Sequence, residues 1–267
     1  MPRAPRIQYP GAYYHITSRG IAKQSIYLDD NDRSFFSRIL DKVIRKLDWR
    51  CNAYCLMDNH FHLLIETPEP NLSIGMKYLN GVYSQRFNVR HERVGHLMQG
   101  RYFSRLVTND SYYYALAQYI VLNPVRAGLC TRASDWRWSS FRATAGYEVN
   151  PAFLDTGFLL DMFNPDIASA RKEYESFIAG AESIDPDVAR TLMKNLLKEM
   201  DAGERPALYV VFSNGSSNHE RDSKIADAYL AHGYTMRQIA QHLGLSEARI
   251  SRILKRRREQ EDASFGV

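Results

Sequence analysis

The sequence is poor in the features that mark secreted and membrane-bound proteins. Its three cysteines, Cys51, Cys55 and Cys130, lack the Cys-x-x-Cys spacing of a zinc site and are too few for a disulfide framework. No window approaches the roughly eighteen apolar residues of a transmembrane helix, and no apolar run follows the arginines of MPRAPR as in a signal peptide. The composition therefore predicts a soluble protein of the reducing cytoplasm.

Charge of one sign is also not in large excess. Lysine and arginine number 35 against 30 acidic residues, which gives a net charge of +5. Many proteins that bind no nucleic acid have such a balance. The stretch RILKRRR at 252–258 gathers basic residues, and such a run is most often a solvated tail. It suits phosphate contacts if the neighbouring structure places it on DNA.

The first part of the chain, to about residue 147, alternates strand and helix patterns. Apolar spacing predicts strands over 12–20, 51–57, 60–66 and 101–108, and helices over 32–47, 72–87 and 111–123. The first helix would present Phe35, Ile39, Val43 and Leu47 and be capped by Asp30, Asn31 or Asp32; Asp110 would cap the third and Pro124 would end it. Strands mixed with helices and joined by a hairpin predict an α+β fold with one antiparallel sheet.

The pattern changes to helical after residue 147. Apolar periodicity continues to about residue 204, SNGSSN at 213–218 is typical of a linker, and 221–258 predicts a compact helical segment. We therefore expect a first domain at 1–147, a helical extension with linker at 148–218, and a helical module at 219–267.

The stretch DNHFHLLIE at 58–66 places two histidines on one strand. Because residues two apart on a strand face the same side, His60 and His62 would project together after a turn at Asp58-Asn59. Paired imidazoles suit a divalent metal ion. They could equally be ordinary polar residues on a wet sheet face. A zinc hydrolase is disfavoured because the H-E-x-x-H pattern is absent, and a two-histidine phosphoesterase because no second strand motif matches.

The helix SYYYALAQYIVLN is rich in tyrosine. Tyr119 and Asn123 lie four residues apart and therefore share one helix face, where a phenol and an amide oxygen could approach a metal together. Tyr112, Tyr113 and Tyr114 are better explained as packing residues. For Tyr119 the residues alone leave both interpretations open.

DNHFHLLIE followed about fifty residues later by YIVLNPVRAGL resembles the REP-associated tyrosine transposases, within the single-tyrosine HUH transposases. The resemblance spans roughly residues 6–147 and implies an α/β sandwich with an RRM- or ferredoxin-like antiparallel sheet. It implies that Tyr119 is the nucleophile and that His60 and His62 bind Mg²⁺ or Mn²⁺, with Asn123 as the third ligand. The tyrosine would cut single-stranded DNA through a 5′-phosphotyrosine and later rejoin it.

The resemblance also implies the partners. Relatives recognise short palindromic DNA hairpins with an adjacent single strand, and they act as monomers or homodimers. Arg101, Arg105 and Arg126 could hold phosphates, although ordinary surface arginines are at least as good an interpretation. A location at the nucleoid follows. The competing hypotheses are a DNA-binding regulator that has lost catalysis and a metal-dependent hydrolase.

GYTMRQIAQHLGLSEARISRILKRRR has the pattern of a helix-turn-helix. Ala240 supplies the small residue at the helix crossing, Gly244 the turn, and Ile250 the apolar anchor of the second helix. A helical wheel then turns Ala248, Ser251, Arg252 and Lys255 outward, where they could enter the major groove of duplex DNA. A helical hairpin used for protein contact is the alternative.

Overall fold

The structure is a computed structural model. It describes residues 8–107, 110–203, 208–212, 218–230, 234, 236–246, 249–254 and 256. The chain forms two compact units: a larger one of residues 10–197 and a smaller one built mainly from the described residues after 197. None of the described helices combines the length and apolarity needed to cross a membrane.

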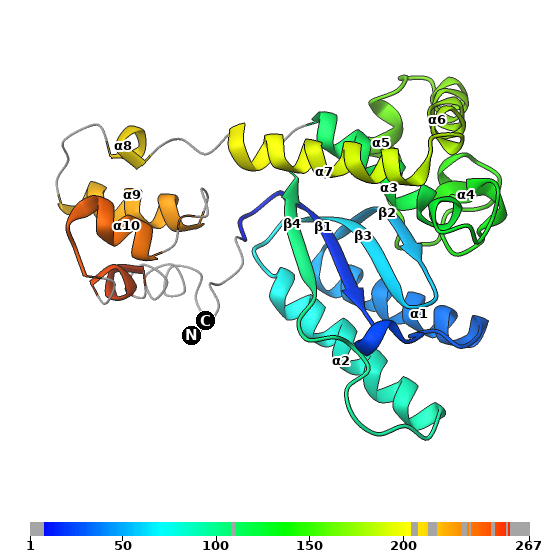
Figure 1. Cartoon of the computed structure of the whole chain (residues 1–267), viewed down its shortest axis with the longest axis horizontal. Coiled ribbons are helices and arrows are strands. Elements are labelled where there is room, and N and C mark those ends of the chain that lie inside the picture. Colours follow the sequence, from blue (N-terminus) through cyan, green and yellow to red (C-terminus); the bar gives the residue numbers. More distant parts are fainter. Residues whose placement is uncertain are drawn as a thin grey trace. The chain divides into compact units, whose positions relative to one another are not determined.

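The larger unit is built on a four-stranded antiparallel sheet (Figure 1). Its strands are β1 (Ala12–Arg19), β2 (Arg50–Leu56), β3 (His60–Thr67) and β4 (Phe103–Val107), in the spatial order β2-β3-β1-β4. With two helices between the strands, the chain order is βαββαβ, the ferredoxin-like arrangement. The predicted fold class, α+β with one antiparallel sheet, is confirmed.

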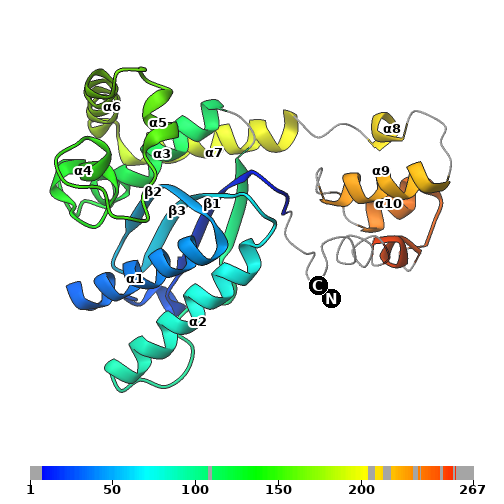
Figure 2. The same ribbon diagram turned by 180° about the vertical axis from the view of Figure 1, so that it is seen from behind.

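Helices α1 (Asp30–Leu47) and α2 (Leu72–Arg90) cover one face of this sheet (Figure 2). The Phe36 ring of α1 packs 4.7 Å, centroid to centroid, from Phe61 of β3. On α2, the Asn80 amide donates to the Ser18 hydroxyl of β1 at 3.2 Å. The side chains of β1 and β3 that face these helices are therefore core residues.

Helix α1 differs in detail from its prediction. Its cap is Asp29, whose Oδ1 accepts a hydrogen bond from the backbone N–H of Asp32 at 3.0 Å, so none of the three predicted residues caps it. Ile39 and Val43 are buried as expected, but Phe35 and Leu47 are only half-buried. Phe36, Leu40 and Ile44 are buried instead, because α1 contacts both the sheet and α2 and needs a broader apolar stripe.

Helix α3 (Asp110–Arg126) packs on the other face of the sheet, where the Tyr113 ring meets the Tyr13 ring of β1 edge-on at 5.5 Å. The helix does not end at Pro124 as predicted but continues to Arg126. Proline removes one N–H donor, but helical bonding continues beyond it, since the Ala127 N–H donates to the Asn123 carbonyl at 2.9 Å.

The segment after α3 packs back onto this unit. It contains η2 (Ala133–Asp135), α4 (Phe141–Thr144), α5 (Gly157–Asp161), α6 (Ile167–Glu182) and the part of α7 (Pro186–Gly203) up to residue 197. The Tyr114 hydroxyl of α3 donates to the Met162 carbonyl at 2.6 Å, and Gln118 donates to the Phe177 carbonyl at 3.0 Å. Residues 148–197 thus belong to the same unit as the sheet. The division of the chain into domains at 1–147, 148–218 and 219–267 stays a prediction.

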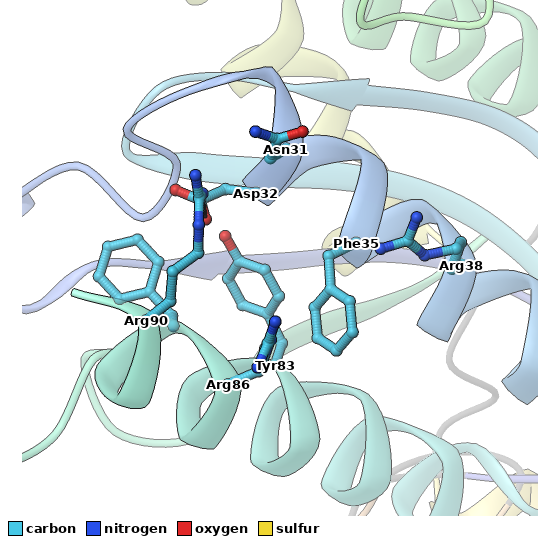
Figure 3. A pocket seen from close by; sticks show the side chains of 8 residues that line it. Asn31, Asp32, Phe35, Arg38, Tyr83, Arg86 and Arg90 are labelled. Carbon is cyan, nitrogen blue, oxygen red and sulfur yellow. Dashed lines mark hydrogen bonds and ion pairs between the residues drawn. The ribbon is translucent and has the colours of Figure 1, made fainter. Parts of the chain in front are cut away.

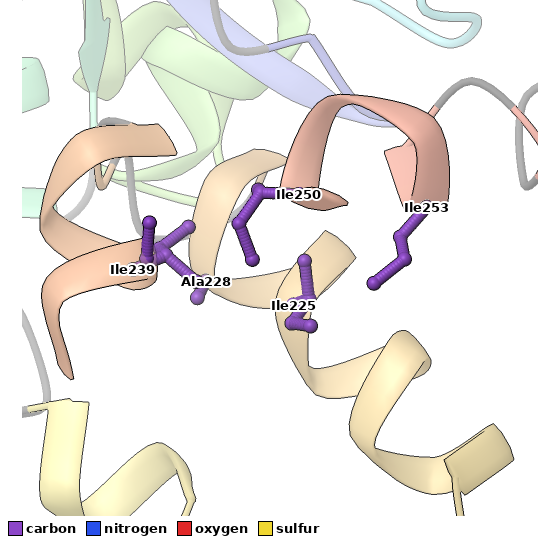
Figure 4. Packing of buried hydrophobic residues seen from close by; sticks show 6 residues of the cluster. Ile225, Ala228, Ile239, Ile250 and Ile253 are labelled. Atoms are coloured by element: carbon purple, nitrogen blue, oxygen red, sulfur yellow. The ribbon is translucent and has the colours of Figure 1, made fainter. Parts of the chain in front are cut away.

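The smaller unit is helical, with α8 (Leu208–Val211), α9 (Asn218–Leu230), α10 (Met236–Leu243) and helical residues 249–254. Ile225 of α9, Ile239 of α10 and Ile250 form its core (Figure 4). Gly244 has φ +65°, and Leu245 N–H donates back to the Ala240 carbonyl at 2.9 Å, which ends α10 in a tight turn. Residues 213–217 of the predicted linker lie outside the described residues.

Candidate active site on the sheet

The two histidines of β3 lie on the sheet face that α3 covers. Their ring centroids are 4.9 Å apart and their planes are nearly perpendicular, at 81°. His62 is buried and His60 half-buried, and the rest of β3 is buried as well. This face is therefore not the wet surface that would explain the pair as ordinary polar residues.

Tyr119 of α3 reaches the same place. Its ring centroid lies 5.6 Å from that of His62, with the planes at 89°, and its side chain is half-buried. The structure thus brings Tyr119 next to a histidine pair that lies more than fifty positions before it in the sequence. The third predicted metal ligand, Asn123, also lies on α3. Its amide nitrogen donates to the Tyr119 carbonyl at 2.7 Å, which leaves Oδ1 as the atom that could bind a metal ion.

Arg126 lies beside the tyrosine. Its guanidinium carbon is 5.3 Å from the centroid of the Tyr119 ring. The side chain is half-buried, and its Nε and Nη1 atoms are buried with no hydrogen-bond partner among the described residues. Burial lowers the pKa of Arg126, and the neighbouring phenol opposes that change. Unpartnered buried donors are costly, so this site is suited to an anion that would accept their hydrogen bonds.

Three polar residues of the site were missed by sequence reasoning, and two of them come from β1. The Nε2 atom of His15 lies 2.9 Å from Nδ1 of His62, and the two rings stack at 5.1 Å. The Thr17 hydroxyl lies 3.2 Å from the same Nδ1. A signal existed, because His15 and Thr17 alternate in AYYHITSRG with the same period of two as the histidine pair.

The third missed residue is Asn59, in the turn before β3. Its Oδ1 lies 2.6 Å from Nδ1 of His60, while its amide nitrogen donates to the Lys23 carbonyl at 3.0 Å. Lys23 and its neighbour Ala22 both have left-handed backbones, with φ of 61° and 52°. Such conformations cost energy in non-glycine residues, so the surrounding contacts must hold this turn in place.

The imidazoles of the site are kept neutral. Burial, helped by the Arg19 charge, lowers the pKa of His60 to about 4. Burial, helped by the Arg105 charge, lowers the pKa of His15 to about 4. Burial and the two neighbouring histidines hold the pKa of His62 well below its ordinary value. At neutral pH each ring therefore keeps a lone pair, which is the form that binds metals.

The donor set fits a divalent ion held by two imidazoles and neutral oxygens. Among the described residues no group of three or more His, Cys, Asp or Glu side chains could hold a metal ion. The predicted set of His60, His62 and the Asn123 oxygen stays a prediction. Imidazole is a softer ligand than the oxygens that Mg²⁺ prefers, so Mn²⁺ is the better match of the two predicted ions.

Two of the predicted DNA-binding arginines lie near β4. Arg101 is exposed just before the strand. Arg105 is the cross-strand partner of His15, so it lies on the same face of the sheet as the histidine site.

The remaining predicted DNA contacts fall in the smaller unit. Ser251 and Arg252 are exposed there, and Lys255 and Ala248 lie outside the described residues. Residues from α9 and from the segment after α10 line a hollow of about 470 Å³: Arg221, Asp222, Arg249, Arg252, Ile253 and Arg256.

A separate pocket of about 230 Å³ lies between α1 and α2 (Figure 3). The Asp32 carboxylate in its wall is already bonded, because Oδ1 accepts from Arg90 at 2.5 Å and Oδ2 accepts from the Leu28 N–H at 2.9 Å. Tyr83 in the same wall donates its hydroxyl to the Ile26 carbonyl. The pocket is on the side of the sheet that α1 and α2 cover, opposite α3. None of the predicted site residues lines it.

Comparison with known proteins agrees with this geometry. Residues 8–123, which include the sheet, both histidines and Tyr119, match the model of the family described as Transposase IS200 like. A Haemophilus influenzae protein described as a candidate REP-associated tyrosine transposase is 26% identical over 153 residues, covering 51% of this chain and 87% of the relative.

Two solved structures resemble parts of the chain. One is a REP-associated tyrosine transposase bound to a REP hairpin, with 21% identity, a TM-score of 0.48, and coverage of 58% of this chain and 93% of that chain. The other is a candidate transposase from Deinococcus radiodurans, with 21% identity, a TM-score of 0.32, and coverage of 46% and 97%. Both TM-scores are too low to support a functional conclusion. The family model over residues 8–123 and the H. influenzae relative together confirm the resemblance that the motifs predicted.

Proposed function

We propose that this protein cleaves and rejoins single-stranded DNA by transesterification at Tyr119. The observation that carries the proposal is the convergence of the Tyr119 ring on the paired rings of His60 and His62, 5.6 Å from the latter. A phenol beside two neutral imidazoles offers a nucleophile and metal-binding nitrogens, which suit tyrosine-mediated phosphoryl transfer.

In the proposed reaction the Tyr119 oxygen attacks the phosphorus of a phosphodiester. The new bond joins the tyrosine oxygen to the 5′-phosphate, the bond from phosphorus to the 3′-oxygen breaks, and the phenolic proton is lost while the departing 3′-oxygen gains one. Because one ester replaces another, the reverse attack by a 3′-hydroxyl can rejoin the strand without ATP. A hydrolytic nuclease loses that possibility.

The residues of the site have separate roles in this scheme. His60 and His62, with the Asn123 oxygen, would hold Mn²⁺ or Mg²⁺. When bound, such an ion supplies a positive charge that neutralises and orients the phosphate. Arg126 would donate its unpartnered N–H groups to the same phosphate, next to the attacking oxygen.

We also propose that the substrate strand carries a hairpin. The support is the resemblance of the DNHFHLLIE and YIVLNPVRAGL motifs to REP-associated tyrosine transposases, together with the likeness to the H. influenzae relative described as one. Arg101 and Arg105, at β4 beside the histidine face, are candidates for contacts to the backbone of that strand. Whether one or two copies act on each DNA stays a prediction.

The smaller unit is proposed to be a helix-turn-helix that binds duplex DNA. Ala240 and Ile250 are buried where the predicted motif needs small and apolar residues, and Gly244 has the left-handed backbone that its turn needs. Arg252 is exposed and lines a hollow in which arginine side chains predominate. Such a surface suits phosphate contacts, which are the main source of affinity for DNA.

The decisive experiment uses the full chain with a labelled hairpin oligonucleotide and Mn²⁺. We expect a covalent protein–DNA band on a denaturing gel, and we expect Tyr119→Phe to abolish it. His60→Ala should also abolish cleavage while hairpin binding, measured by gel shift, stays near the wild-type level. Binding without any adduct would indicate a DNA-binding regulator instead. Free 5′-phosphate ends that persist in Tyr119→Phe would indicate hydrolysis.

A further inference from the structure

A histidine can bind a metal ion only through a ring nitrogen that carries a lone pair. A neutral imidazole has one such nitrogen and one N–H, and the hydrogen bond made by the second nitrogen decides which is which. The groups next to the Nδ1 atoms of His60 and His62 therefore decide whether each Nε2 atom can bind a metal ion.

His60 has an unambiguous arrangement. The Asn59 amide nitrogen donates to the Lys23 carbonyl at 3.0 Å, so it is the oxygen of Asn59 that lies 2.6 Å from Nδ1 of His60. An amide oxygen can only accept a hydrogen bond. His60 must therefore carry its proton on Nδ1, which leaves the lone pair on Nε2.

His62 has two arrangements open to it. Its Nδ1 lies 2.9 Å from His15 Nε2 and 3.2 Å from the Thr17 hydroxyl. If His62 donates from Nδ1 to His15, the His62 lone pair is on Nε2, as in His60. If His15 donates instead, the His62 proton is on Nε2 and that nitrogen cannot bind a metal ion. The Thr17 hydroxyl lies 3.4 Å from His15 Nε2 and 3.2 Å from His62 Nδ1 and can donate to either nitrogen, so it is compatible with both arrangements. Only the first arrangement leaves the Nε2 atom of His62 able to bind a metal ion.

We infer that His15 is a positioning residue that accepts the Nδ1 proton of His62. Through this bond His62, like His60, keeps its lone pair on Nε2. The inference rests on the proposed function, since it assumes that His60 and His62 hold a metal ion. It adds a residue that does not contact the substrate but decides whether the site can bind the metal. The two ring planes are only 18° from parallel with centroids 5.1 Å apart, which suits an in-plane N–H···N bond between rings that meet edge to edge.

The test combines a spectroscopic measurement with metal binding. In metal-free protein labelled with ¹⁵N-histidine, long-range ¹H–¹⁵N correlation spectra should show His62 protonated on Nδ1. His15→Leu should produce a population protonated on Nε2 and should weaken Mn²⁺ binding, measured by electron paramagnetic resonance, by about ten- to a hundredfold. His15→Gln keeps an acceptor oxygen and should restore most of the affinity. His96→Leu, at an exposed histidine, is the matched control.

The outcomes separate the inference from the proposed function. A His62 ring protonated on Nε2 in the wild-type protein would overturn the role of His15, and so would unchanged Mn²⁺ affinity in His15→Leu. Direct bonding of His15 to the metal ion, seen as coupling between its Nε2 and bound ¹¹³Cd²⁺, would make it a ligand and overturn the inference as well. A correct tautomer in a protein that binds no Mn²⁺ would uphold the positioning bond and refute the metal-dependent function.

A second inference concerns Phe103 on the edge strand β4, which is 55% exposed. Phe103 is the cross-strand partner of Thr17, and Thr17 contacts His62, so the phenyl ring lies on the face of the histidine site. Arg105 follows two residues later on the same face, and exposed Arg101 precedes the strand. An exposed aromatic ring between arginines is typical of surfaces that bind single-stranded nucleic acid.

The geometry points to Phe103 as a stacking platform for an unpaired base next to the cleaved phosphate. Every base has an aromatic face, so stacking needs no particular sequence, and it requires a base that is free of a duplex. The neighbouring arginines would hold the phosphates on either side. This inference also depends on the proposed substrate class, and it assigns a place for the single strand beside the hairpin.

The test uses a hairpin with an unpaired flank that contains 2-aminopurine, and a blunt hairpin of the same stem. Phe103→Leu should weaken binding of the flanked hairpin by roughly tenfold and remove the quenching of 2-aminopurine. Phe103→Trp should retain both, and blunt-hairpin binding should not change. Tyr78→Leu, an exposed aromatic on α2, is the control. Equal affinity of wild type and Phe103→Leu would overturn the inference, whereas failure of wild type to bind either hairpin would refute the proposed function.

Discussion

Substitution of Arg126 should change the rate of strand cleavage without lowering the stability of the protein. Its guanidinium lies 5.3 Å from the Tyr119 ring, and two of its buried N–H donors have no partner among the described residues. Each unsatisfied buried donor costs on the order of 1 kcal/mol or more in the folded protein. Arg126 therefore destabilises the folded protein unless an anion binds there.

The expected size of its contribution follows from Coulomb's law. For unit charges about 5 Å apart at an effective dielectric constant of about 20, the interaction is about 3 kcal/mol. Arg126→Gln removes that charge from the phosphate and from the attacking oxygen. We expect the rate of strand cleavage to fall somewhat more than a hundredfold. Arg126→Lys keeps the charge without the planar donors and should recover part of the rate.

Single-turnover cleavage of a labelled hairpin with saturating Mn²⁺ gives the rate, and urea denaturation of the metal-free protein gives the free energy of unfolding. We expect Arg126→Gln to leave that free energy unchanged or to raise it by up to about 1 kcal/mol, because it removes unpaired donors. A wild-type cleavage rate in Arg126→Gln would refute this reasoning. So would a loss of several kcal/mol of stability, because the arginine would then be supporting the fold.

Three further outcomes test other parts of the structure. The metal-free protein should lose stability as the pH falls from about 6.5 to about 4, because the folded-state pKa of His60 is about 4 and lies below its unfolded value. The loss is up to about 2 kcal/mol for this ring, and a flat profile in thermal denaturation would contradict the prediction. Gly75→Ala should destabilise the protein by about 1–3 kcal/mol in urea denaturation, since the new methyl group would lie 2.3 Å from the Trp49 ring. Gly81→Ala, with open space at that position, should not. Arg252→Gln should lower the salt slope of duplex binding by about one, and an unchanged slope would show that this arginine contacts no phosphate.

The parts of the site that the sequence predicted are those with a local periodicity. His60 and His62 share a face because strand residues alternate, and Tyr119 and Asn123 share one because helix residues four apart align. Their proximity in space came from the resemblance, since spacing alone left the role of Tyr119 open. The structure supplies that proximity directly, through the 5.6 Å between the rings of His62 and Tyr119.

The residues that were missed depend on the order and register of the strands. His15 meets His62 because β1 lies beside β3 in the sheet and Thr17 pairs with His62. No local pattern encodes that register, which is set by the burial of the whole opposite face. Arg126 was singled out only as one of several arginines, because its place over the Tyr119 ring requires α3 to continue beyond Pro124.

The register of β1 and the chemistry of the site are therefore coupled. A slip of β1 by one residue against β3 would turn His15 and Thr17 to the α1–α2 face and bring Ile16 to the histidines. His62 would then be buried with an unpartnered Nδ1, and the apolar face would gain an imidazole and a hydroxyl. Both changes are unfavourable, because buried polar groups need partners. The hydrogen bond that we propose to position His62 thus also favours the native strand pairing, and a variant at His15 should affect both the tautomer of His62 and the stability of the fold.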